Sequence, residues 1–214
     1  LVSGGAGMVG SAIVDTVLAR GAREVRVLDN FSRGIPDHLG PAIATGRCSL
    51  IEADLRDDAA VRSAMQDVNI VFHQSAMRVT RCAQDPRAAF DSMAGGALNV
   101  FTAAAEARVD RVVAASSGVI YGAADVIPTP ETQHPYHDTT MYGALKQFEE
   151  GMLRALGDQY ELPYAILRYA NVYGPRCALT TDAEVLVRWM EAIDRGDAIT
   201  VSYTHLTLPT ILLV

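Results

Sequence analysis

The sequence predicts an α/β fold built on a doubly wound parallel sheet. Short apolar runs rich in β-branched residues have the length of buried strands, and longer segments between them repeat apolar residues at helical spacing. The expected strands are residues 25–28, 70–73 and 112–115, and the expected helices are residues 8–20, 88–108 and 142–156. Strands that alternate with helices form βαβ units, whose ligands bind beyond the carboxyl ends of the strands.

The composition is that of an ordinary globular domain, with 50% hydrophobic and 20% charged residues. The net charge of -7 would repel nucleic acid and anionic membranes, so neither is expected as a partner. The cysteines, Cys48, Cys82 and Cys177, are widely spaced and lack the C-x-x-C pattern of zinc sites, so no metal is expected. No apolar stretch is long enough to span a membrane and none resembles a signal peptide, which predicts a cytoplasmic protein.

Both ends of the chain are expected to depart from a complete fold. Leu1 lies only a few residues before the first glycine, whereas a strand usually has about five or six residues. Residues 202–210 read SYTHLTLPT, which matches the translation of a transposon-end adapter used in sequencing libraries, with a genuine Thr-rich strand as the alternative. We therefore expect an N-terminally clipped domain over residues 1–201, followed by a non-native segment over residues 202–214.

A glycine-rich motif opens the first expected helix. Residues 4–10 read GGAGMVG, and Asp29 follows the next expected strand, about 20 residues further on. Glycines let the backbone approach a pyrophosphate, and an acidic side chain at this distance accepts hydrogen bonds from a ribose. This pattern predicts a Rossmann dinucleotide site, with a purely structural glycine turn as the alternative. Asp29 would repel the 2′-phosphate of NADP, so the predicted cofactor is NAD, a preference that the nearby Arg33 moderates.

Three further residues have the properties of a proton-transfer site. Tyr142 and Lys146 are four residues apart in an expected helix, which places both side chains on one face. A phenol titrates near pH 10, so it can act as a base at neutral pH only beside positive charge, which a lysine and an oxidised nicotinamide would supply. Ser117 follows the expected strand at 112–115 and could reach the same substrate oxygen.

The order of these motifs resembles that of the NAD-dependent epimerase/dehydratase family. This family belongs to the extended short-chain dehydrogenases/reductases, and the resemblance is to the branch that acts on nucleotide sugars. The matching segments are residues 4–10, 29–30, 54–55, 116–117, 121–122, 142–146 and 168–176. The resemblance covers residues 1 to about 201. It implies that the chain lacks most of a C-terminal substrate domain, which completes the sugar pocket in relatives.

The resemblance also implies roles for individual residues. The implied cofactor-binding residues are Gly4, Gly7, Met8, Val9, Gly10, Asp29, Asn30, Asp54, Leu55, Gln74, Ser75, Ala76, Arg78, Tyr142, Lys146 and Tyr169, and the implied substrate-binding residues are Ser117, Tyr142 and Asn171. Asp54 and Leu55 match the family's pair on the adenine side of the cofactor. Alternatives stay open: Asp54 could cap a helix and Asn171 could cap a turn. His73 is interpreted as a packed histidine, Arg168 and Arg176 as structural residues, and Met93 is given no cofactor contact.

In relatives, the tyrosine removes a proton from a sugar hydroxyl while hydride passes to NAD, and the resulting keto-sugar stays bound. Return of the hydride to the opposite face gives the 4-epimer. The 4,6-dehydratases carry Asp-Glu directly after the serine or threonine, where this chain has Gly118 and Val119, so the resemblance favours a UDP-hexose 4-epimerase. A dehydratase, an NAD(P)-dependent reductase and a non-enzymatic NAD(P)-sensing protein are the alternatives. A homodimer is expected through the helices at 88–108 and 142–156.

Overall fold

The computed structural model describes residues 1–133, 138–177 and 185–198. The chain divides into two compact units, Leu1–Val172 and Tyr173–Val214, and the first contains all the strands of the described residues. Within the described part of the second unit, the one helix is α8, Val185–Arg195. The proposed non-native segment at 202–214 lies outside the described residues.

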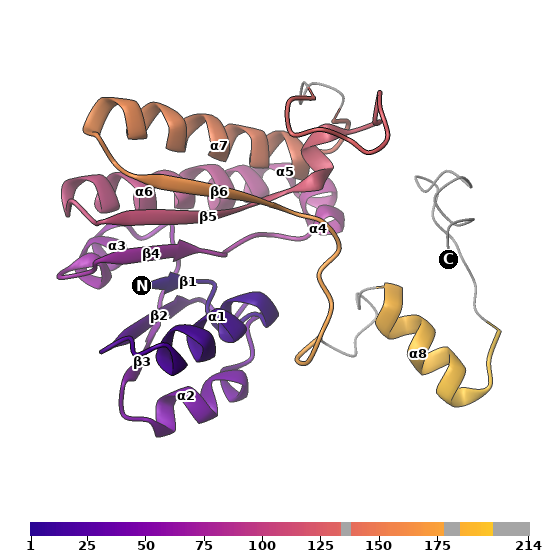
Figure 1. Ribbon diagram of the computed structural model, residues 1–214, viewed down its shortest axis with the longest axis horizontal. Coiled ribbons are helices and arrows are strands. Elements are labelled where there is room, and N and C mark those ends of the chain that lie inside the picture. Colours follow the sequence, from indigo (N-terminus) through magenta and orange to yellow (C-terminus); the bar gives the residue numbers. More distant parts are fainter. Residues whose placement is uncertain (134–137, 178–184, 199–214) are drawn as a thin grey trace. The chain divides into compact units, whose positions relative to one another are not determined.

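The first unit contains a six-stranded sheet in the order β3-β2-β1-β4-β5-β6, and all its paired strands are parallel (Figure 1). The strands are β1 Val2–Ser3, β2 Val25–Asp29, β3 Cys48–Glu52, β4 Ile70–His73, β5 Arg111–Ser117 and β6 Tyr164–Tyr169. This is the strand order of a dinucleotide-binding Rossmann sheet, so the predicted doubly wound fold is confirmed. The order reverses between β1 and β4, and ligands of such sheets bind at that switch point.

The helices of this unit are α1 Met8–Ala19, α2 Gly40–Ala44, α3 Asp58–Met65, α4 Val79–Gln84, α5 Pro86–Ala89, α6 Gly96–Glu106 and α7 Met141–Tyr160. Short 3₁₀ turns precede α2 and follow β5, at Pro36–Leu39 and Gly118–Tyr121. The helix expected at 88–108 instead comprises α5 and α6, joined through a π-helical turn at Phe90–Gly95. The helices expected at 8–20 and 142–156 correspond to α1 and α7.

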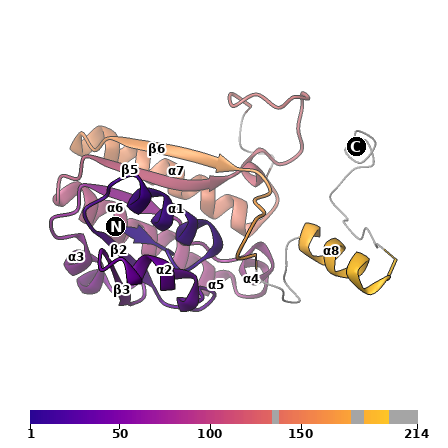
Figure 2. The same ribbon diagram turned by 60° about the horizontal axis from the view of Figure 1, so that its bottom comes forward.

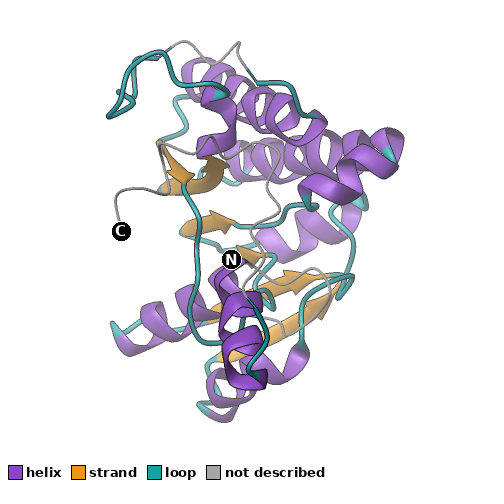
Figure 3. Ribbon diagram, turned by 90° about the vertical axis from the view of Figure 1, so that its right-hand side faces the viewer, coloured by secondary structure: helices purple, strands orange, loops and turns teal. Residues whose placement is uncertain are grey.

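Helices cover both faces of the sheet, as the turned views show (Figures 2 and 3). On one face, Val27 and Val25 pack with α1 and α2 side chains such as Val14. On the other face, Leu28 packs with α3, α6 and α7, where Phe101 is fully buried. Neighbouring residues of β2 thus face opposite cores, which explains why Val27 and Leu28 are both apolar and both buried.

Candidate cofactor-binding and catalytic site

The glycine loop connects β1 to α1 and lies against the end of β4. Gly4 has a φ of +69°, and a Cβ at this position would stand 2.7 Å from the backbone nitrogen of Ser75. A Cβ at Gly10 would stand 2.2 Å from the carbonyl oxygen of Gly4. The N-cap of α1 is Gly7, which has no side chain to accept hydrogen bonds from the first helical amides. This close backbone cradle at a helix N-terminus fits the pyrophosphate of a dinucleotide.

Asp29 is the last residue of β2, and its buried carboxylate holds the glycine loop in place. Its Oδ2 accepts a hydrogen bond of 3.0 Å from the Ala6 amide, and its Oδ1 accepts one of 2.9 Å from the Phe31 amide. A Cβ at Gly34 would lie 2.8 Å from each carboxylate oxygen, so the segment after Asp29 folds closely over it. The predicted ribose acceptor therefore also shapes the loop that would hold the phosphates.

Asp54 and Leu55 follow β3 and occupy two different environments. The guanidinium of Arg56 donates to both Asp54 oxygens, each at 2.9 Å, and this contact holds the pKa of Asp54 well below its usual range. Asn30 donates a further bond of 3.0 Å to the same carboxylate. Asp54 is therefore an anion that links the ends of β2 and β3.

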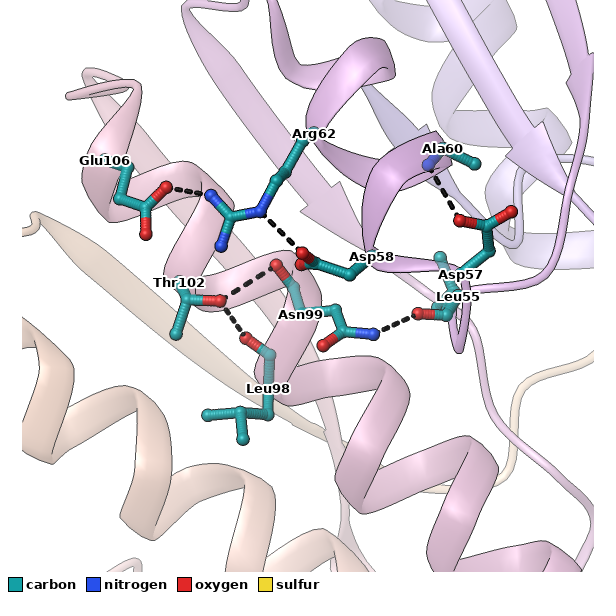
Figure 4. Close-up of polar contacts among 9 residues, drawn as sticks. All are labelled: Leu55, Asp57, Asp58, Ala60, Arg62, Leu98, Asn99, Thr102 and Glu106. Atoms are coloured by element: carbon teal, nitrogen blue, oxygen red, sulfur yellow. Dashed lines mark hydrogen bonds and ion pairs between the residues drawn. The ribbon is translucent and has the colours of Figure 1, made fainter.

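The helix-capping alternative for Asp54 is wrong, because the N-cap of α3 is Asp57, which accepts from the Ala60 amide at 3.0 Å (Figure 4). Leu55 is buried, and its carbonyl accepts a 2.8 Å hydrogen bond from the Asn99 side chain, as Figure 4 also shows. A Cβ at Gly96 would lie 2.9 Å from Leu55 Cβ, so α6 approaches this loop closely. Together Asn99 and Gly96 fix the backbone at the expected adenine side.

The last residue of β4, His73, and the next residue, Gln74, differ in character. His73 is fully buried, with Nδ1 in a 2.7 Å hydrogen bond with Ser3 Oγ and its ring edge-on to Phe101. Burial, with a smaller contribution from Lys146, lowers the pKa of His73 to about 3, so it is a neutral packed histidine as interpreted from the sequence. Gln74 accepts a 3.3 Å hydrogen bond from the Tyr169 hydroxyl, while its buried Nε2 has no partner among the described residues.

The next residues after β4, from Ser75 to Arg78, also lie at the carboxyl end of the sheet. Ser75 lies under Gly4, Ala76 is exposed, and Arg78 is the N-cap residue of α4. Met93 is buried against Cys82, with 3.7 Å between their sulfur atoms. The orphan amide of Gln74 beside the glycine loop offers a hydrogen-bond donor to a ligand at the switch point.

The three predicted catalytic residues lie at the end of β5 and in the first two turns of α7. Ser117 is the last residue of β5, and its Oγ accepts a 3.2 Å hydrogen bond from the Val119 amide. Tyr142 is the second residue of α7, whose N-cap Thr140 accepts from the Gly143 amide at 3.0 Å. Lys146 lies one turn further on and donates to the carbonyl of Ala115, two residues before Ser117.

Lys146 is almost completely buried, and its ammonium makes two hydrogen bonds with described residues. One reaches the Ala115 carbonyl at 3.0 Å and the other reaches Glu149 Oε2 at 2.8 Å. Among the described residues, no direct hydrogen bond joins the Tyr142 hydroxyl to Ser117 or to Lys146. The three residues therefore share one end of the sheet, but their hydroxyl groups and the ammonium are not connected directly.

The end of β6 completes the site from the other side of β5. Tyr169 is paired with Ser117 in the sheet, and its hydroxyl reaches Gln74 at the end of β4, so these two side chains bridge the end of β5. Arg168 forms a 2.9 Å ion pair with Glu150 and donates to the Tyr121 hydroxyl at 2.8 Å, which fits a structural role. Asn171 is exposed just beyond the strand.

The family model described as the NAD dependent epimerase/dehydratase family matches residues 1–206. The chain belongs to this family. A putative UDP-glucose 4-epimerase of Methanocaldococcus jannaschii is 34% identical over 179 residues, which is 82% of this chain and 56% of that protein. The predicted family membership is thus confirmed, and the family description makes NAD the cofactor of this site.

Solved structures of this family have the same fold. The UDP-glucose 4-epimerase of Thermotoga maritima, determined with UDP-glucose, superposes with a TM-score of 0.87 at 30% identity and covers 95% of this chain and 65% of its own. The Thermus thermophilus UDP-glucose 4-epimerase in complex with NAD has a TM-score of 0.84 at 35% identity, covering 94% and 64%. Matches at 27% identity include a dTDP-glucose 4,6-dehydratase and a UDP-N-acetyl-alpha-D-glucosaminuronate decarboxylase. The chain spans less than two thirds of the length of each of these epimerases.

The structure adds residues that the sequence analysis did not find. They include Arg56 and Asn99, which position the backbone and the carboxylate after β3. The most consequential addition is Glu149, one turn after Lys146 on the same helix. Its spacing of three residues from Lys146 could have identified it, because residues three apart on a helix share a face.

The described residues also carry two findings about other classes of site. Over residues 1–133, 138–177 and 185–198, no group of His, Cys, Asp and Glu side chains is arranged to hold a metal ion. None of the helices in this part of the chain has the length and apolar character that crossing a membrane requires.

Proposed function

We propose that this chain carries the NAD-binding and proton-transfer part of a nucleotide-sugar 4-epimerase, with a UDP-hexose as the favoured substrate. The observation that carries the proposal is the hydrogen bond from Lys146 to Ala115, which holds α7, with Tyr142 one turn before Lys146, beside the end of β5 where Ser117 lies. Ser117, Tyr142 and Lys146 belong to the set that the family resemblance implies. The similarity to the putative UDP-glucose 4-epimerase of Methanocaldococcus jannaschii and to the UDP-glucose 4-epimerase of Thermus thermophilus supports the substrate class.

NAD, when bound, supplies a hydride acceptor that can also return the hydride. Residues Gly4 to Gly10 would hold its pyrophosphate, Asp29 its adenosine ribose, and the backbone at Asp54 and Leu55 its adenine. Tyr142 would remove a proton from the sugar hydroxyl and later restore it, which is general acid–base catalysis. Lys146 would favour the phenolate through its charge, and Ser117 would hold the reacting oxygen by a hydrogen bond.

The residues after Ser117 favour epimerisation over dehydration. Gly118 and Val119 form a 3₁₀ turn, and the Val119 amide donates to Ser117 Oγ. Neither side chain can exchange a proton, whereas elimination of water from a sugar needs an additional acid and base. A dehydratase or an NAD(P)-dependent reductase of the same family is the second candidate, supported by the dehydratase match. A non-enzymatic NAD(P)-sensing protein has no need of Ser117, Tyr142 and Lys146 together.

The reaction class can be tested by incubating the full-length protein with NAD and, separately, UDP-glucose, UDP-galactose and dTDP-glucose, with products identified by proton NMR. Interconversion of UDP-glucose and UDP-galactose without net NADH formation is the expected result. A 4-keto-6-deoxy product would instead establish a dehydratase. Stoichiometric NADH release would establish a dehydrogenase, and either result would refute the epimerase proposal.

We also propose a homodimer through the outer face of α7 and the neighbouring π-helical turn. Phe148 and Phe90 are 49% and 47% exposed and stack on each other with ring centroids 6.5 Å apart. A shallow groove next to Phe148 is lined by Gln147, Gly151, Met152 and Ala155. An exposed apolar strip on two helical elements suits an isologous contact, in which the same surface is buried twice.

Phe148→Glu is expected to convert the dimer to a monomer, because burying an unpaired carboxylate in an apolar interface is costly. Sedimentation equilibrium of the full-length protein at micromolar concentration measures the mass. Ile43→Glu, on α2 and 42% exposed, is the matched control and should leave the dimer intact. A monomeric wild-type protein, or equal dissociation of both variants, would exclude this interface.

A further inference from the structure

Glu149 is a buried acidic residue in direct contact with the proposed catalytic lysine. Its Oε2 lies 2.8 Å from Lys146 Nζ, and the two side chains are 4% and 1% exposed. The same ammonium donates to the Ala115 carbonyl at 3.0 Å. Glu149 therefore lies one helical turn beyond Lys146, on the inward side of α7, and pairs with it out of contact with solvent.

The surroundings make Glu149 the counter-ion of Lys146. The adjacent Glu150 is already engaged by Arg168 at 2.9 Å and by the Ser116 hydroxyl. From the neighbouring elements, His73 on β4 is neutral and Cys82 on α4 is a buried thiol whose pKa burial raises. Arg154, further along α7, acts electrostatically on Glu150.

The Glu149 carboxyl has unused bonding capacity in this environment. Its Oε1 is buried without a hydrogen-bond partner among the described residues. Burial raises the pKa of Glu149, against the opposing contact with Lys146. The Glu149 carboxyl is shielded from solvent and only one of its oxygens is hydrogen-bonded, so the Lys146 ammonium is the main group that keeps it ionised. The ionisations of Glu149 and Lys146 therefore depend on each other.

This pairing affects how strongly Lys146 can act on Tyr142. An ammonium stabilises a nearby phenolate through its positive charge. The Glu149 carboxylate, 2.8 Å from the Lys146 ammonium, offsets most of the electrostatic effect of that charge on other side chains such as Tyr142. Neutralising Glu149 would leave the charge of Lys146 uncompensated. The Tyr142–Lys146 pair would then lose its first proton more readily, from whichever of the two groups holds it less tightly.

We propose that Glu149 is a positioning residue that holds the Lys146 ammonium at the end of β5 and sets the pH at which the Tyr142–Lys146 pair gives up its first proton. This inference rests on the proposed function only in taking Tyr142 and Lys146 as the proton-transfer pair. It concerns the free protein, so it can be tested without turnover and without a bound ligand.

Lys146 is the only lysine among these 214 residues. In full-length protein labelled with carbon-13 at the lysine ε-carbon, its resonance is identified by its absence from a Lys146→Arg variant, and the chemical shift of that resonance follows the ionisation of Lys146. Phenolate formation at Tyr142 is followed in parallel by ultraviolet absorbance, as the difference between each protein and its Tyr142→Phe counterpart. Both titrations are run on the full-length wild-type protein, on Glu149→Gln and on the control Glu150→Gln.

In Glu149→Gln, the first of the two titrations is expected about 1 pH unit or more below its wild-type midpoint, because an opposite charge at contact distance shifts an ionisation by about 1 to 3 units. Glu150→Gln removes an equal charge one residue further on, but that carboxylate is paired with Arg168, so a much smaller change is expected. Unchanged midpoints in Glu149→Gln, or equal shifts in both variants, would overturn the proposal.

A second measurement needs no substitution at Glu149. In the wild-type chain, protonation of Glu149 should also move the Lys146 resonance, as a separate step on the acid side, above the roughly pH 4.3 of an ordinary glutamate. The step should lie above that value because burial raises the pKa of Glu149. A Lys146 resonance that stays constant through the acid range would contradict the pairing. The outcome is independent of whether the full-length protein epimerises a sugar.

Discussion

Tyr142→Phe in the full-length protein is expected to lower turnover by about 10² to 10⁴-fold, the usual contribution of positioned proton transfer. Phenylalanine keeps the packing of the ring against the buried cluster that contains Met93 and Leu145, and it removes only the hydroxyl. NAD affinity and thermal unfolding should therefore remain close to those of the wild type. The measurements are the rate of sugar interconversion and an NAD titration.

Tyr160→Phe is the matched control, because Tyr160 lies at the other end of α7 and is 52% exposed. It should leave turnover unchanged. Near-normal activity in Tyr142→Phe would show that another group is the base. Lys146→Ala is a less selective test, because it would leave the Glu149 carboxyl buried without its partner. Breaking a buried pair in this way typically costs about 3 to 5 kcal/mol of stability, so activity and folding would be lost together.

The parts of the sheet that the sequence predicted are its central strands. β2, β4 and β5 each have strands on both sides, so their apolar runs stand out. The two strands that were missed, β3 and β6, are the edges of the sheet. β3 reads CSLIE and β6 reads YAILRY, and every residue of both strands is half-buried or exposed. Edge strands carry this weaker pattern because one side of them faces solvent.

The candidate site shows the same division between local and tertiary information. The glycine loop, Asp29 and the Tyr142–Lys146 spacing are local patterns, and the fold brings them to the carboxyl ends of the strands as expected. The buried amide of Gln74 and the Arg56 contact of Asp54 depend on side-chain directions that spacing does not determine. The inward direction of the Lys146 side chain could not be predicted from spacing either. Its helical face was predictable, but its hydrogen bonds to Ala115 and Glu149 required the packing of α7 against β5.

Asp29→Ala is expected to weaken NAD binding by roughly 10- to 150-fold, because a hydrogen bond to a charged group contributes about 1.5 to 3 kcal/mol. Affinity for NADP should fall much less, since the same substitution removes a carboxylate that would repel the 2′-phosphate. The measurement is a calorimetric titration of the full-length protein with each cofactor. Selectivity for NAD over NADP is the decisive quantity, because it compares two ligands on one protein.

The structure adds a second consequence to this substitution. The Asp29 carboxylate also accepts from the Ala6 and Phe31 amides, so alanine at this position would leave two loop amides without their acceptor. A change confined to the loop would weaken both cofactors alike, since both carry the same pyrophosphate. Asp37→Ala is the control, because it removes an equal charge from an exposed position in the turn before α2. Equal losses of NAD and NADP in Asp29→Ala would show that Asp29 shapes the loop and does not bind the ribose.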